Sequence, residues 1–100
     1  MPDPRIFPIT RATDTFATVG VVSTLVLAAN NRRVDAEIVN DGAQICYLAR
    51  GNAAVMGSGI RVNAQGGSYR IGTNNMFYGD INGICADGQL NLTISEGYLP

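Results

Sequence analysis

The stretch VDAEIVNDGAQICYLAR, residues 34–50, carries the clearest strand signals of the chain. Over residues 34–39 apolar side chains alternate in the period-2 pattern of a strand with one buried face. Asn40-Asp41-Gly42 follows, a turn signal in which glycine takes a positive φ. Residues 45–49 are apolar throughout and read as a second strand. The stretch therefore predicts an antiparallel hairpin, the central piece of the fold.

The second strand of this hairpin is predicted to bury side chains on both faces. One face should meet the core, and the other should meet either a second layer or a sister subunit. Ile45, Tyr47 and Ala49 are expected on one face, and Cys46 and Leu48 on the other.

Six further segments have short β-branched or alternating patterns, separated by turns. They are residues 15–20, 24–28, 60–62, 69–71, 80–86 and 89–95. Residues 60–71 are expected to pair around the turn 64–67. Residues 80–95 are expected to form a second clear hairpin through Asp87-Gly88, with Leu90, Leu92 and Ile94 facing inward.

These signals predict an all-β protein with about eight short strands, since turns recur every 8–12 residues. The expected architecture is a single antiparallel β-sandwich, jelly-roll-like, or a small barrel. Twelve glycines and four prolines oppose helix formation. A chain of 100 residues is one domain, which we place at residues 14–100, after an extended N-terminal arm at residues 1–13.

The arm contains prolines and apolar residues together. Prolines prevent a helix there, and Ile6, Phe7 and Ile9 make the arm apolar where a disordered tail would be polar. We therefore expect it to dock, on its own domain or on a neighbouring subunit. It does not resemble a signal peptide, and the longest apolar run, residues 19–29, is too short to span a bilayer, so we expect a soluble protein made in the cytoplasm.

Composition argues against several function classes. The net charge of −1 provides no electrostatic footprint for nucleic acid or an anionic membrane. The absence of histidine removes the commonest general base and metal ligand, and two cysteines alone cannot make a standard structural zinc site. We therefore expect no enzyme, no cofactor and no metal site. All seven basic residues are arginine, which is favoured at interfaces, although compositional drift is an equal alternative.

The remaining candidate side chains each have a structural alternative. Cys46 and Cys85 lie in predicted strands, where buried free thiols are expected and a single disulfide is the alternative. The carboxylates lack any visible pairing for acid–base work, so we expect them to serve turns and strand surfaces. The aromatic residues are expected to fill the core or a subunit interface, the alternative being a sugar-binding platform. That platform would comprise Tyr47, Tyr69, Phe77 and Tyr78.

Over residues 15–97 the chain resembles a domain of small virion proteins of tailed bacteriophages. The resemblance lies in patterns, turns and spacing. It is carried by LAANNRR (27–33), ICYL (45–48), GSGIRVNAQGGS (57–68), ICADG (84–88) and LTISEG (92–97). The arm and residues 80–83 depart from the pattern. The resemblance implies a β-sandwich used as a capsid decoration (cement) protein or as a tail or fibre accessory.

Two functions follow as expectations. The first is a virion structural protein that binds the major capsid protein, or another virion protein, as a homo-oligomer (trimer or dimer) and stabilises the capsid. The second is a carbohydrate- or receptor-binding module of a tail or fibre, using the loops 51–59 and 72–79. For the first, the candidate interface residues are Ile6, Phe7, Ile9, Arg32, Arg33, Tyr98 and Leu99.

Overall fold

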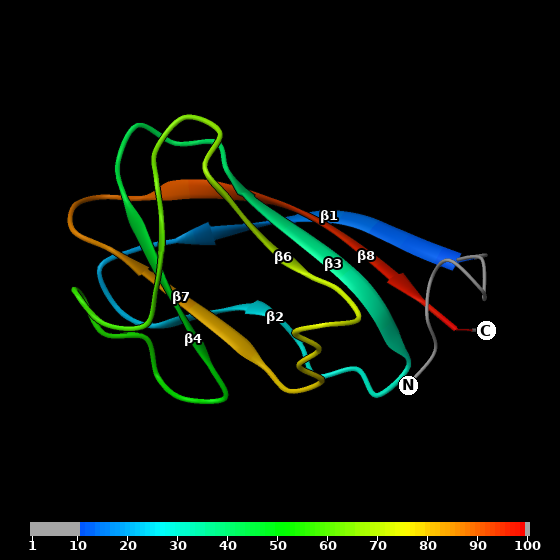
Figure 1. Cartoon of the computed structure of the whole chain (residues 1–100). Helices are drawn as coiled ribbons and strands as arrows, with labels where there is room; N and C mark the ends of the chain where they lie inside the picture. The colour runs from blue at the N-terminus through cyan, green and yellow to red at the C-terminus, as the bar shows by residue number, and fades with distance from the viewer. Residues whose placement is uncertain (1–10, 100) are drawn as a thin grey trace.

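The computed structural model describes residues 11–99, which form eight strands in two antiparallel sheets (Figure 1). The strands are β1 (Arg11–Val19), β2 (Thr24–Leu27), β3 (Arg33–Asn40), β4 (Cys46–Arg50), β5 (Ile60–Val62), β6 (Ser68–Ile71), β7 (Ile81–Cys85) and β8 (Leu90–Tyr98). This part of the chain has no helix. The predicted all-β class is confirmed.

The strand order is β1-β8-β3-β6 in one sheet and β2-β7-β4-β5 in the other. Of the strands that follow each other along the chain, only β4 and β5 are hydrogen-bonded neighbours. Every other connection carries the chain from one sheet to the other. This is the strand order of a jelly roll, in which two sheets lie over a shared core.

The hairpin predicted over residues 34–50 is wrong, because its two strands lie in different sheets. β3 pairs with β6 and β8, whereas β4 pairs with β5 and β7. The turn between them is held against β8, since the Asp41 amide donates to the Asn91 carbonyl at 3.0 Å. Anchored there, the chain turns away from its own sheet and enters the second one.

Gly42 is required in this turn for space rather than for a positive φ, which was the predicted reason. It is absent from the glycines that adopt a positive φ. A Cβ at this position would lie 2.7 Å from the Cβ of Leu90, closer than two carbon atoms can approach. The turn thus packs its backbone directly onto the first residue of β8.

The pairings predicted within residues 60–71 and 80–95 are wrong for the same reason. β5 and β6 lie in different sheets, as do β7 and β8. Gly88 does adopt the positive φ of +57° that the Asp87-Gly88 signal indicates. A turn signal and an alternating pattern show where a strand reverses and which face is buried. They do not show which strand becomes its neighbour.

Both sheets contribute to a single hydrophobic core. Its buried members are Val19, Val26, Leu27, Ala36, Ile38, Cys46, Leu48, Val62, Ile71, Ile81, Cys85, Leu90, Leu92 and Ile94. The inward orientation predicted for the alternate residues of β8 is therefore confirmed. In β4, Cys46 and Leu48 face the core, while Tyr47 and Ala49 on the opposite face are half-buried.

β1 begins inside the segment expected to be an arm. Residues 11–13 are its first three residues, and they pair with residues 96–98 of β8. Residues 1–10, the rest of the predicted arm, lie outside the described residues.

Candidate functional site

Four of the predicted interface residues meet at one end of the molecule, where β3 begins and β8 ends. Arg33 is paired in register with Tyr98, and the Leu99 amide donates to the Arg32 carbonyl at 2.9 Å. Tyr98 also pairs with Arg11, so the described chain begins at this end too. The other predicted members, Ile6, Phe7 and Ile9, lie outside the described residues.

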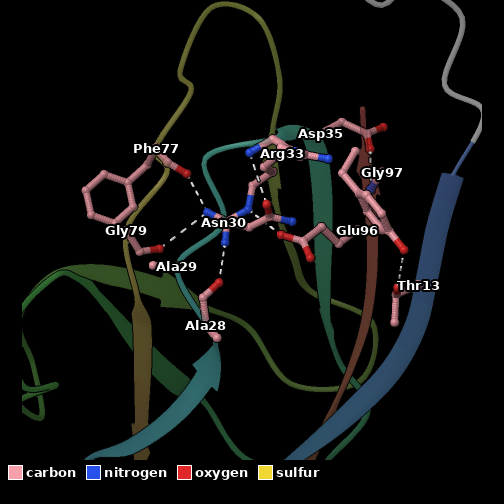
Figure 2. Close-up of polar contacts among 12 residues, drawn as sticks. Thr13, Ala28, Ala29, Asn30, Arg33, Asp35, Phe77, Gly79, Glu96 and Gly97 are labelled. Atoms are coloured by element: carbon pink, nitrogen blue, oxygen red, sulfur yellow. Dashed lines mark hydrogen bonds and ion pairs between the residues drawn. The ribbon is translucent and has the colours of Figure 1, made fainter. Parts of the chain in front are cut away.

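Arg33 is not part of an exposed patch, contrary to expectation. Its side chain is fully buried, and its Nε donates to Glu96 Oε2 at 2.6 Å (Figure 2). Nη2 donates to the Ala28 carbonyl at 2.7 Å, and Nη1 donates to the Phe77 and Gly79 carbonyls. The planar guanidinium suits this arrangement because its five donors point in fixed, divergent directions.

These bonds make Arg33 a clamp between three segments far apart in the chain. They join the β2–β3 connection, the loop between β6 and β7, and the C-terminal part of β8. Two further hydrogen bonds join the β2–β3 connection to the loop between β6 and β7. The Asn30 amide donates to the Tyr78 carbonyl at 2.8 Å, and the Ala29 amide donates to the side-chain Oδ1 of Asp80 at 2.7 Å. The end of the sandwich is therefore a fixed surface.

Of the four predicted interface residues at this end, Arg32, Tyr98 and Leu99 remain accessible. Arg32 is exposed, while Tyr98 and Leu99 are half-buried. The Tyr98 hydroxyl lies 3.2 Å from Thr13 Oγ1, which ties the ring to β1. An exposed arginine and an anchored tyrosine at the same end of the sandwich suit a contact with another protein, because both residue types are enriched at interfaces.

A pocket of about 350 Å³ lies between β4 and the loop that leads to β5. Its lining mixes polar side chains, Arg50, Asn52 and Ser58, with the apolar Val55 and Ile60. The Arg50 guanidinium also stands 5.9 Å from the centre of the Phe77 ring, a cation–π distance. This pocket belongs to the loop 51–59 that the carbohydrate alternative singled out.

The four aromatic residues of the alternative sugar platform do not form one surface. Tyr69 and Phe77 pack against the core, as the core-filling alternative predicts. Tyr47 is half-buried on the outer face of β4, and Tyr78 is exposed in the loop before β7. An aromatic platform is therefore not assembled from these residues.

Cys46 and Cys85 are directly opposite each other on β4 and β7, and both are buried free thiols, as expected. Burial raises the pKa of Cys46 to about 11 from 9.0, and Cys85 adds to the rise, while a backbone hydrogen bond at Ile84 opposes it. The thiol is protonated at neutral pH, so Cys46 lacks the thiolate a nucleophile needs.

Several carboxylates stabilise strands, as expected. Asp35 Oδ1 accepts from the Gly97 amide at 3.0 Å, and its other oxygen lies 3.8 Å from Arg70. Asp14 accepts from the Ser95 hydroxyl at 2.7 Å. Within residues 11–99, no three His, Cys, Asp or Glu side chains gather as metal ligands would.

Nowhere in the described part of the chain is there a helix with the length and apolar character needed to cross a membrane.

Glu96 and the buried Asn40 were missed by sequence reasoning. Glu96 sits in a hydrophilic end of β8, where an acidic residue normally faces solvent, and Asn40 reads as a turn residue. The sequence contains only a weak signal that Arg33 would be buried. Arg33 is the first residue of β3, and only its contacts in the folded chain distinguish it from its exposed neighbour Arg32.

Comparisons of the chain with models of protein families, with curated proteins and with solved structures each find no match.

Proposed function

We propose that the chain is a non-enzymatic virion structural protein of a tailed bacteriophage. Made in the host cytoplasm, it decorates the capsid as a homo-oligomer and stabilises contacts between copies of the major capsid protein or another virion protein. The observation that carries the proposal is the strand order, β1-β8-β3-β6 over β2-β7-β4-β5. Jelly rolls with this order occur in viral capsid domains. This support is fold-level analogy, joined to the sequence resemblance described above.

The surface proposed to meet the capsid is the fixed end formed by Arg32, Tyr98 and Leu99. Its base is held by the buried Arg33 clamp, so little conformational freedom is lost when a partner binds. Apolar side chains are also exposed elsewhere, among them Val22 at 69 % and Val55 at 59 %. A second contact surface on the particle would cover such side chains.

The experiment uses heads of the phage that encodes the chain, stripped of this protein and mixed with the purified full chain. Bound copies per head and the temperature of head disruption are measured. The proposal expects saturable binding and a rise in disruption temperature. Arg32→Glu reverses the charge of the exposed arginine at the proposed surface and should weaken binding about tenfold or more. Arg61→Glu, an exposed arginine on β5, is the matched control and should bind normally. Heads that bind no protein at saturating concentration would overturn the proposal.

The alternative is a carbohydrate-binding module, which the pocket beside β4 favours. Lectin domains also use the jelly roll, and the pocket offers amide, hydroxyl and guanidinium groups beside apolar side chains. A glycan array probed with the full chain separates the two functions. A glycan signal that Asn52→Ala abolishes would favour this alternative. A silent array together with saturable binding to heads would favour the capsid role.

A further inference from the structure

We infer that the β1 edge is a docking surface for a second copy of this chain, whose own β1 adds to it as an antiparallel strand. The β1-β8-β3-β6 sheets of the two copies would then join at their β1 edges and form one continuous eight-stranded sheet across a two-fold axis. The inference rests on the proposed function, because it says how the homo-oligomer proposed there would form. Its test, however, uses isolated protein without phage heads. Failure of the dimer and failure of capsid binding are therefore distinguishable.

The first argument is the contrast between β1 and the other edge strands. Sheet edges expose unpaired backbone groups, and proteins protect them with short strands, charges or bulges. β2 has four residues and a register shift, β5 has three with Arg61 at its centre, and β6 has four with Arg70. β1 has nine residues in unbroken register with β8.

β1 carries two charged residues, Arg11 and Asp14, but it has neither the short length nor the register shift seen at the other edges. RATDTFATV has no proline, no glycine and no lysine, and its three threonines, Phe16 and Val19 favour a strand. Residues 11–16 are exposed, and Phe16 keeps 66 % of its surface accessible. Within the described residues, β8 is the only strand partner of β1.

The second argument explains why the strand that pairs with the free edge of β1 belongs to another copy of this chain. Pairing about a two-fold axis satisfies the free edges of both β1 strands at once and leaves neither exposed, which gives a closed dimer. The strand carries one positive residue, Arg11, and one negative residue, Asp14, so two copies do not repel each other. A partner of matching strand length is supplied by the chain itself.

Two registers centre the pairing on the middle of β1. With the axis at Thr15, the midpoint of the strand, all nine residues pair and Phe16 lies opposite Asp14 of the second copy. With the axis at Phe16, the two phenylalanines lie opposite each other. A carboxylate introduced at position 16 would face another carboxylate in either register, and such like-charge pairs weaken strand pairing.

The test measures the mass of the full chain by sedimentation equilibrium over a dilution series. The wild type is expected to rise from 10.6 kDa toward about twice that mass. Phe16→Asp should raise the dissociation constant about tenfold or more. Val22→Asp changes an equally exposed apolar residue outside the strand and should dimerise like the wild type.

Hydrogen exchange supplies the second readout. In the dimer, alternate amides of β1 should gain protection, because only every second residue directs its amide toward the new strand. A wild type that stays monomeric at millimolar concentration would overturn the inference. So would a trimer, a Phe16→Asp variant that dimerises unchanged, or a dimer without new protection in β1.

Discussion

Arg33 Nε and Glu96 Oε2 lie 2.6 Å apart, joining the first residue of β3 to the C-terminal part of β8. The arginine side chain has no exposed surface, and that of Glu96 keeps 12 %. A pair this buried gains stability only when its remaining donors are satisfied. Here the carbonyls of Ala28, Phe77 and Gly79 satisfy them. The pair is thus the centre of a polar network rather than an isolated ion pair.

Arg33→Ala should destabilise the protein by about 3–5 kcal/mol, because it leaves a buried carboxylate and three carbonyls without their donor. Arg32→Ala is the matched control: the neighbouring side chain is exposed, so its loss should change stability by about 0.5 kcal/mol or less. Urea unfolding of both variants measures the difference. Equal stabilities of the two variants would contradict the clamp.

Asn40→Asp should destabilise the protein by about 2–4 kcal/mol. The buried Asn40 Nδ2 donates to the Gln44 carbonyl at 2.8 Å and to the Val62 carbonyl at 3.3 Å. A carboxylate would place an acceptor against both carbonyls. In the control, Asn63→Asp, the exposed side chain still accepts from Arg61, so chemical denaturation should show little change. A stable Asn40→Asp variant would show that this turn tolerates the missing donors.

Gly83→Ala should destabilise the protein by about 1–3 kcal/mol through overpacking. The added Cβ would lie 2.9 Å from Val26 Cγ2 and 3.3 Å from atoms of Leu48 and Val19, all within the core. At Gly20 the nearest atom would be 3.6 Å away, so Gly20→Ala should be neutral or slightly stabilising. The two melting temperatures test this; a Gly83→Ala variant as stable as Gly20→Ala would mean that the core has spare room.

The Cys46 thiol should make stability fall as the pH rises from about 9 to about 11. Its pKa is raised from 9.0 to about 11 by burial, so in this window the unfolded chain releases a proton that the folded chain retains. The contribution is fully present below pH 9 and is lost above pH 11. Cys46→Ala should therefore show a flatter dependence of unfolding free energy on pH than the wild type. Parallel curves for the two proteins would contradict the raised pKa.

The sequence predicts the number, position and buried faces of the strands well, because alternation such as Leu90, Leu92 and Ile94 depends only on which side meets the core. It fails on pairing. Asn40-Asp41-Gly42 looks like a hairpin turn, yet the space beside Leu90 and the bond from Asp41 to Asn91 direct the chain across the sandwich. Contacts with a strand about fifty residues away decide this, and no local pattern contains them.

The candidate site was predicted in part. The sequence marked Arg32, Tyr98 and Leu99, and the structure brings them to one end. It could not separate Arg33 from Arg32, because burial of one arginine depends on carbonyls from two loops and on Glu96, which all converge only in the folded chain. Polar networks assembled from distant segments leave little trace in a single sequence.

The position of β8 has a consequence for synthesis of the protein. β8 is translated after the other seven described strands, yet it lies between β1 and β3, so its sheet has no centre until β8 emerges. A nascent chain ending before β8 would hold β1 without the strand that pairs with it in the described residues, so the backbone groups of β1 would be open to other chains. Until β8 is available, this sheet therefore has an open strand edge, the kind of surface through which partly folded chains aggregate.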